Sequence, residues 1–95
     1  QYQNIGSQPI FNVVLYDPIP FFSTLVQNAY GSTGEVELVC PNGAVVRPDL
    51  GNTNSISLNL AALCTLPTAP QPGGGSAPAL LPGQGGYFVY RVQVN

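Results

Sequence analysis

The sequence predicts an all-β fold: a small antiparallel β-sandwich, immunoglobulin-like or jelly-roll-like in outline, with about six or seven short strands and one disulfide bond. Apolar and polar residues alternate over short runs, as they do on strands that bury one face. Proline or glycine interrupts nearly every stretch that is long enough for a helix. A length of 95 residues favours one domain, spanning 1–95.

The N-terminal part of the chain predicts an arm followed by two strands. Residues 1–9 are polar, and we expect them to form a flexible arm. Residues 10–16 are the most apolar run and predict a strand that ends near Pro18. Residues 22–30 predict a second, less regular strand, and a turn at 31–34 follows it.

A hairpin is predicted where the strands 35–40 and 44–48 flank a three-residue loop made of Pro41, Asn42 and Gly43. In this type of loop the first two residues form a type I turn, and the glycine takes the left-handed conformation. The alternative is a two-residue Asn-Gly loop, which shifts the pairing of the two strands by one residue.

The two loop lengths can be told apart by which side chains they place opposite each other. The three-residue loop places Leu38 opposite Val46 and Glu37 opposite Arg47, which suits both faces of the hairpin. The two-residue loop would place Leu38 opposite Arg47 and so mix core with surface. We therefore predict the three-residue loop, with four side chains pointing inward: Val36, Leu38, Cys40 and Val46.

Two cleanly alternating runs and one proline- and glycine-rich tract make up the rest of the chain. Residues 55–60 predict a half-buried strand, and residues 61–64 predict its continuation or one helical turn. The tract 65–86 lacks periodicity and predicts an ordered surface loop or a linker. Residues 87–94 alternate again and predict the last strand.

Cys40 and Cys64 are expected to form the disulfide bond, because a small domain with little charge gains from a covalent link. Two free, buried thiols are the alternative. The chain starts at Gln1 rather than Met, which favours a processed, secreted protein. We therefore expect an extracellular or cell-surface location.

The composition argues against several classes of function. Two Arg and four acidic residues give a net charge of −2, which does not suit binding to nucleic acid phosphates. The sequence contains no His or Lys that could activate a Ser or Thr nucleophile, so we do not expect an enzyme. No apolar run approaches the roughly 18 residues of a membrane span.

The acidic residues are expected to have ordinary structural roles. Glu35 and Glu37 alternate along one strand and should lie on its solvated outer face, with Glu37 facing Arg47. The alternative is a carboxylate pair for acid–base chemistry or for Ca²⁺. Asp49 and Asn52 offer oxygen ligands, but such residues also satisfy their own backbone in turns. We expect no catalytic residue, metal site or cofactor.

The leading functional hypothesis is a structural, non-enzymatic subunit of an extracellular assembly, such as a pilus-like filament or a surface shell. In this hypothesis the N-terminal strand leaves its own domain and completes a sheet of a neighbouring copy, so the partner is the protein itself. Head-to-tail donation does not close and therefore builds filaments. The contact residues would be apolar members of the first strand: Ile10, Phe11, Val13, Val14 and Leu15.

The alternative hypothesis is a secreted carbohydrate-binding module with glycans as partners. Exposed aromatic rings can stack on sugar rings, and an Asn- and Gln-rich surface without charge suits sugar hydroxyl groups. The candidate aromatic residues are Tyr2, Tyr16, Tyr30, Tyr87, Tyr90, Phe21 and Phe22. Packing in the core and across strands is the ordinary role of such residues.

Overall fold

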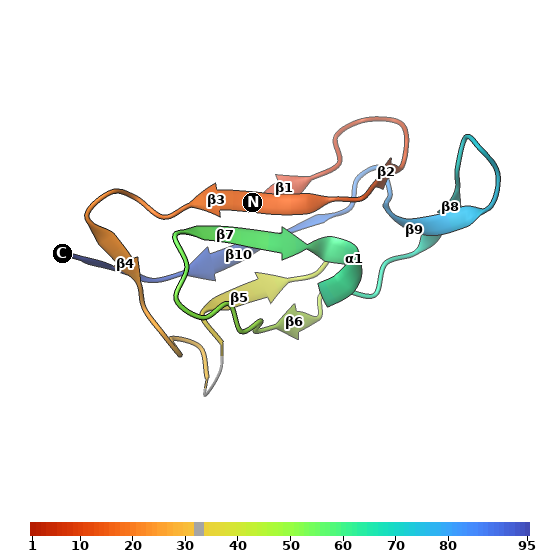
Figure 1. Cartoon of the computed structure of the whole chain (residues 1–95). Coiled ribbons are helices and arrows are strands. Elements are labelled where there is room, and N and C mark those ends of the chain that lie inside the picture. The colour runs from red at the N-terminus through yellow and green to blue at the C-terminus, as the bar shows by residue number, and fades with distance from the viewer. Residues whose placement is uncertain (32–33) are drawn as a thin grey trace.

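The computed structural model describes residues 1–31 and 34–95; Ser32 and Thr33, in the turn predicted at 31–34, lie outside the described residues. The described ranges form eleven strands and one short helix (Figure 1). In chain order the elements are β1 (Tyr2–Gln3), β2 (Ile10–Phe11), β3 (Val14–Pro18), β4 (Ser23–Leu25), β5 (Val36–Val39), β6 (Val45–Val46), β7 (Ser55–Asn59), α1 (Leu60–Leu63), β8 (Thr68–Pro70), β9 (Ser76–Leu80), β10 (Gly85–Tyr90) and β11 (Val92–Val94).

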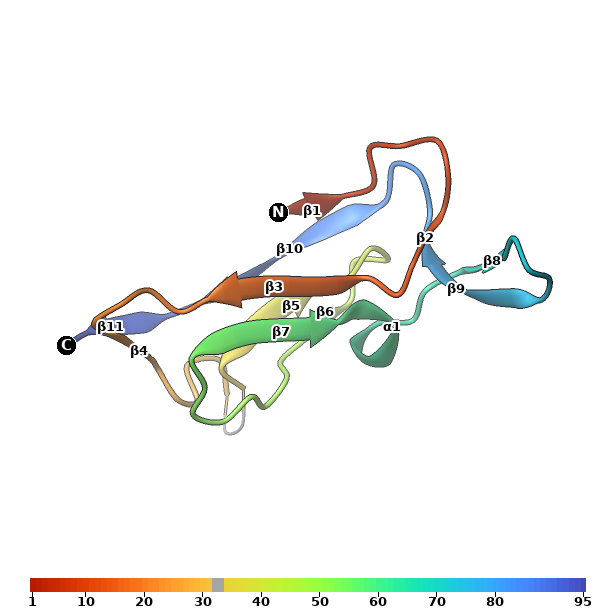
Figure 2. The ribbon, with the colours of Figure 1, turned by 45° about the horizontal axis from the view of Figure 1, so that its top comes forward.

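The strands form two layers, as in a sandwich, with an extension at each end. One layer is an antiparallel sheet of order β1-β10-β5-β6, and the antiparallel pair β3-β7 lies across it (Figures 1 and 2). The sheet β2-β9-β8 extends from one end of this body, and the pair β11-β4 extends from the other. The molecule is therefore elongated, with extents of 48 × 25 × 20 Å. The predicted all-β antiparallel class is confirmed.

The core lies between the two layers. Val36 and Leu38 of β5 and Ile56 and Leu58 of β7 are fully buried. Burying one such side chain stabilises a fold by roughly 1.5–3 kcal/mol, so these facing strands contribute much of the stability. Half-buried side chains from neighbouring elements complete the cluster, among them Tyr2, Val13, Leu15, Phe88 and Tyr90.

The strands are shorter and more numerous than predicted because irregular residues divide the longer runs. The run 10–16 divides at Asn12, whose φ of 56° is a left-handed conformation that Asn tolerates better than most residues. It becomes β2 and β3. The run 87–94 divides at Arg91 into β10 and β11, and only the start of 22–30 is a strand, β4.

The predicted hairpin and its register are confirmed. Leu38 lies opposite Val46. Gly43 has a φ of +89°, the left-handed conformation that the three-residue loop requires. The side-chain oxygen of Asn42 accepts the Ala44 N–H at 3.0 Å, which fixes the loop. The loop chemistry and the two faces of the hairpin both favoured this register, so a local prediction succeeded here.

The strand at 55–60 and the helical turn after it also follow the sequence pattern. Ile56 and Leu58 are buried, while Ser57 and Asn59 are exposed. Asn59 caps α1, because its side-chain oxygen accepts the Ala62 N–H at 3.3 Å. The cap converts the end of the strand into one turn of helix.

The predicted flexible arm at 1–9 is instead tied to the body. Its first residues form β1, which pairs with Gly85 and Gly86 of β10. Asn4 is buried, and its side-chain amide donates to the carbonyl oxygens of Gln8 at 2.8 Å and Leu80 at 2.9 Å. Composition could not reveal this, because the partners that satisfy Asn4 include a segment 76 residues away.

The tract 65–86, predicted to be a loop or linker, has ten of its 22 residues in strands. It contains β8 and β9, which pair with Ala69 opposite Ala77, and it supplies the start of β10. Ala79 and Leu80 of β9 are buried. Pro70 is tolerated in β8 because β8 is an edge strand, and edge strands do not need every N–H for the ladder.

Candidate binding and assembly sites

Four of the five residues predicted to contact a neighbouring subunit are paired with strands of their own chain, and the fifth, Val13, accepts the Leu60 N–H through its carbonyl oxygen at 3.0 Å. Ile10 and Phe11 of β2 lie opposite Leu80 and Ala79 of β9. Val14 and Leu15 of β3 lie opposite residues of β7. The side chains of Ile10 and Val14 are exposed, whereas those of Phe11, Val13 and Leu15 are half-buried.

A linker at residues 19–22 joins β3 to β4 and carries the most exposed aromatic side chains of the described residues. Phe21 is 94% exposed and Phe22 is 80% exposed. Phe22 has a φ of 59°, a strained conformation for a bulky side chain. With Ile19, Pro20, Ser23 and Asn54, the two rings line a hollow of about 300 Å³.

The linker is held to the rest of the chain by backbone hydrogen bonds at its two ends. The Ile19 N–H donates to the carbonyl oxygen of Asn54 at 2.8 Å. The carbonyl oxygen of Phe22 accepts the Asn95 N–H at 2.7 Å. The exposed part of the linker is thus a short arch between two fixed points.

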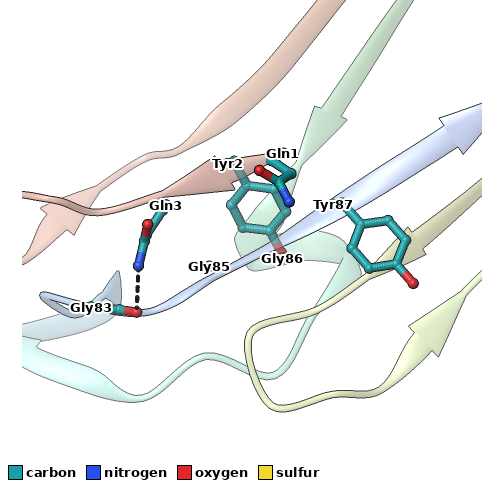
Figure 3. A pocket seen from close by; sticks show the side chains of 7 residues that line it. All are labelled: Gln1, Tyr2, Gln3, Gly83, Gly85, Gly86 and Tyr87. Carbon is teal, nitrogen blue, oxygen red and sulfur yellow. Dashed lines mark hydrogen bonds between the residues drawn. The ribbon is translucent and has the colours of Figure 1, made fainter.

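A second hollow, of about 330 Å³, lies beside the paired strands β1 and β10 (Figure 3). It is lined by two tyrosines, two glutamines and three glycines: Tyr2, Tyr87, Gln1, Gln3, Gly83, Gly85 and Gly86. We call this hollow the β1–β10 pocket. The side-chain amide of Gln3 donates to the carbonyl oxygen of Gly83 at 3.4 Å, a long hydrogen bond.

The pocket needs glycine at two positions because β1 lies against β10 there. A Cβ atom on Gly85 would overlap the carbonyl oxygen of Tyr2. A Cβ atom on Gly86 would overlap the carbonyl oxygen of Val39 and approach the Tyr2 hydroxyl to 2.7 Å. That hydroxyl donates to the Val39 carbonyl oxygen at 2.8 Å, and burial raises the pKa of Tyr2.

Of the seven aromatic residues singled out in the sequence, the pocket gathers Tyr2 and Tyr87. Phe21 and Phe22 belong to the other hollow, and the remaining three tyrosines line neither. Sequence reasoning missed the glutamines and glycines of the pocket. The signal was the Gly85-Gly86 pair at the start of an aromatic strand, which is typical of close backbone approach.

Glu35 is buried, at 1% exposure, so its predicted place on the solvated face is wrong. One carboxylate oxygen accepts the Asn28 N–H at 2.9 Å. The other accepts the N–H groups of Leu50 at 2.8 Å and Gly51 at 3.0 Å. These hydrogen bonds, led by that from Asn28, lower the pKa of Glu35, although burial acts in the opposite direction.

The other acidic residues make local contacts. Glu37 pairs with Arg47 at 3.1 Å on the surface, as predicted. Asp17 accepts a 2.6 Å hydrogen bond from the Tyr90 hydroxyl, and burial together with this carboxylate raises the pKa of Tyr90 to about 12. Asp49 accepts the Gly51 N–H at 3.2 Å, as expected of a turn residue. Within residues 1–31 and 34–95, no three His, Cys, Asp or Glu side chains gather as a metal site would require.

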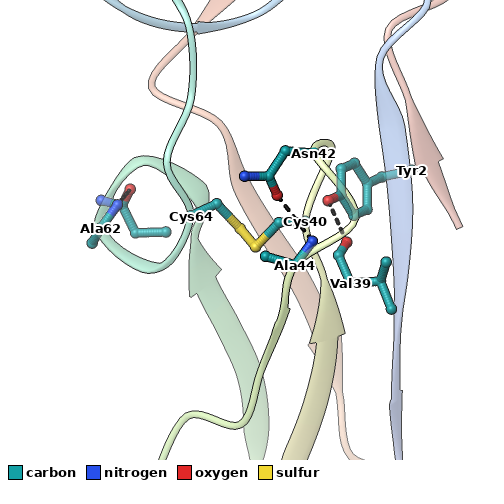
Figure 4. The surroundings of a disulfide bond; sticks show 8 residues. Tyr2, Val39, Cys40, Asn42, Ala44, Ala62 and Cys64 are labelled. Atoms are coloured by element: carbon teal, nitrogen blue, oxygen red, sulfur yellow. Dashed lines mark hydrogen bonds between the residues drawn. A yellow bond between two sulfur atoms is a disulfide. The ribbon is translucent and has the colours of Figure 1, made fainter.

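Cys40 and Cys64 form the predicted disulfide bond, with their Cα atoms 5.7 Å apart (Figure 4). Cys40 follows β5 and Cys64 caps the end of α1, so the bond links the two layers. Both residues are buried. A disulfide of this kind indicates folding in an oxidising environment.

The helix of the described residues, α1, has four residues and is too short to cross a membrane. No protein-family model, curated protein or solved structure matches this chain.

Proposed function

We propose that the chain is a non-enzymatic structural subunit of an extracellular assembly of its own copies, a pilus-like filament or a surface shell. In this assembly residues 1–18 of one copy pair with the body of the next. The observation that carries the proposal is the way this N-terminal segment is attached. All its strand partners are distant in sequence, and a short, exposed, strained linker joins it to the body.

The pairings of the N-terminal segment suit exchange between copies. β1 pairs with β10, β2 with β9 and β3 with β7. A neighbouring copy offers the same three partner strands, so exchange replaces each contact by an identical one. The free energies of the two arrangements then differ mainly through the linker and through the loss of freedom on association.

The linker favours the exchanged arrangement. The positive φ of Phe22 costs about 1–3 kcal/mol, and an extended linker relieves that cost. Pro18 at the end of β3 and Pro20 in the linker fix φ and favour an extended conformation of the residue before each of them. Short hinge loops under strain are a recognised cause of domain swapping.

The low charge of the chain supports self-association. Six charged side chains in 95 residues leave little repulsion between copies. Natural edge strands are commonly protected by Lys or by inward-pointing charges, and this chain contains no Lys. Repeated head-to-tail donation leaves a free donor and a free acceptor at the two ends, so it produces filaments.

The first experiment measures the mass and shape of the protein in solution, by light scattering and negative-stain electron microscopy. The proposal predicts long regular filaments or shells. A stable monomer of 9.9 kDa at high concentration would show that the protein is not an assembly subunit.

The second experiment identifies which chain supplies the first strand. Tyr16 and Ser57 lie opposite each other on β3 and β7, and both are exposed, so Tyr16→Cys with Ser57→Cys places two thiols within bonding reach. After assembly and oxidation, strand donation predicts covalent dimers and longer oligomers on a denaturing, non-reducing gel. Monomers alone would show that β3 stays in its own chain.

A matched control uses a pair that cannot exchange in this way. Val39 and Val45 face each other within the β5–β6 hairpin. Val39→Cys with Val45→Cys should give monomers on the same gel, whether or not the protein assembles. Oligomers from this control would mean that cross-linking between copies is unspecific.

A further inference from the structure

We propose that the β1–β10 pocket binds an uncharged sugar residue of a glycan. The pocket is lined by two tyrosines, two glutamines and three glycines, contributed by the N-terminal residues and by β10 with the turn before it (Figure 3). Its volume of about 330 Å³ lies at the small end of the range of ligand sites. The occupant is therefore one or two rings of a saccharide.

The lining residues match the two chemical faces of a sugar. A pyranose ring has apolar C–H faces, which pack on aromatic rings, and a rim of hydroxyl groups, which both donate and accept hydrogen bonds. Tyr87 is 46% exposed and so has ring surface available for contact. The amides of Gln1 and Gln3 supply donors and acceptors at the rim of the pocket.

The glycines add backbone groups to the site. Gly83 lets a ligand approach the main chain closely, because nothing lies within 4 Å of a Cβ atom there, whereas the space beside Gly85 and Gly86 is filled by Tyr2 and Val39. The Tyr2 hydroxyl already donates to the Val39 carbonyl oxygen, so Tyr2 is fixed in place before any ligand arrives. A preformed wall of this kind lowers the entropy cost of binding.

The same lining disfavours other classes of ligand. No Lys or Arg side chain is among the described residues that line the pocket, so a phosphate or another anion finds no charged side-chain partner. No Asp or Glu side chain is among them either, which disfavours a cation. The glutamine amides and backbone groups disfavour a purely apolar ligand, which would leave them unsatisfied.

The inference is independent of whether the protein assembles. β1 pairs with β10 either in its own chain or, in the proposed assembly, in a neighbouring one. The pocket has the same residues in both arrangements. Failure of sugar binding would therefore leave the assembly proposal intact, and a monomeric protein could still bind sugar.

The test is a titration of the full chain with three soluble probes: cellohexaose, chitohexaose and, as a charged comparison, a hexamer of galacturonic acid. Binding is followed through the amide resonances of Gly83, Gly85 and Gly86. Tyrosine fluorescence gives a second signal, because the chain has five Tyr and no Trp. We expect at least one neutral probe to shift these three amides at about 10 mM, which would saturate a site with a millimolar Kd.

The variant Tyr87→Ala should weaken binding of that neutral probe by about tenfold. Tyr16→Ala is the matched control, because Tyr16 is 66% exposed but does not line the pocket. Gln3→Ala provides a second pocket variant whose side chain is exposed, in case Tyr87→Ala fails to fold. The control should bind as the unchanged protein does.

Three results would overturn the proposal. The first is that neither neutral probe shifts the glycine amides. The second is that the acidic hexamer binds as well as the neutral ones. The third is that Tyr16→Ala loses as much affinity as Tyr87→Ala and Gln3→Ala, because the ligand would then lie elsewhere.

Discussion

Glu35 holds two loops of the molecule together through one buried carboxylate. Asn28 belongs to the segment after β4, whereas Leu50 and Gly51 belong to the segment after β6. The negative charge of Glu35 is stabilised by three backbone N–H groups. In the described ranges Arg47 forms its ion pair with Glu37 and not with Glu35. A carboxylate with three such donors is strongly stabilised in its charged form.

The lowered pKa of Glu35 predicts a loss of stability in acid. Its pKa in the folded state lies below the value of about 4.3 in the unfolded chain, so the charged form stabilises the fold above that pH. This contribution is lost as the pH falls through the folded-state pKa. Thermal unfolding followed by circular dichroism should show the loss as the pH falls below about 4.3.

The variant Glu35→Gln tests the role of the buried carboxylate. It replaces one of the two carboxylate oxygens by an NH2 group, which cannot accept a hydrogen bond from a backbone N–H. We expect Tm at pH 7 to fall by at least about 5 °C, and to depend less on pH than in the unchanged protein. Glu37→Gln removes only a surface pair and should change Tm by at most about 2 °C. Equal losses in the two variants would contradict the role given to Glu35.

At the scale of single elements, the packing of β1 against β10 depends on Gly85 and Gly86, the two residues with which β1 pairs. Gly86→Ala would push a Cβ atom into Val39 and Tyr2. We expect a loss of about 1–3 kcal/mol in the free energy of unfolding, measured in urea. Hydrogen exchange at the Asn4 amide, which donates to the Gln84 carbonyl oxygen at 2.9 Å, should also become faster.

Gly73→Ala is the control for this prediction, because nothing lies within 4 Å of a Cβ atom at Gly73. Its free energy of unfolding should change by no more than about 0.5 kcal/mol. If Gly86→Ala were as mild as Gly73→Ala, β1 would not be packed against β10 as described.

Elements differ in how far the sequence predicted them. The β5–β6 hairpin was predictable with its register, because Gly43 and the facing pairs are local signals. The tract 65–86 was not: β8 and β9 pair with each other inside a stretch rich in proline and glycine, and β9 also has a distant partner, because Leu80 lies opposite Ile10 of β2. Proline and glycine there indicate local irregularity, and only tertiary pairing overrides it.

For the whole molecule, the disulfide bond is the covalent link between the two layers. Cys40 and Cys64 are separated by 24 positions, and closing a loop of that size should contribute about 3–4 kcal/mol. Cys40→Ala with Cys64→Ala should lower the free energy of unfolding in urea by about this amount. A change below about 1 kcal/mol would show that the packed core suffices without the bond.

The candidate pocket was only partly predictable at this scale. Tyr2 and Tyr87 were recognisable as candidates for sugar contact, but 85 positions separate them, and nothing local brings them together. The pocket forms because β1 pairs with Gly85 and Gly86. Its residues therefore depend on a long-range strand pairing.

The all-β class, the disulfide pair and the local hairpin could be predicted from the sequence, because alternation, cysteine number and loop chemistry are local signals. The burial of Glu35 and Asn4, the strands within 65–86 and the pocket shared by two distant tyrosines depend on the folded arrangement of the chain. A polar group can be buried wherever the fold supplies its hydrogen-bond partners. For Asn4 one of those partners, Leu80, is 76 positions away in the chain.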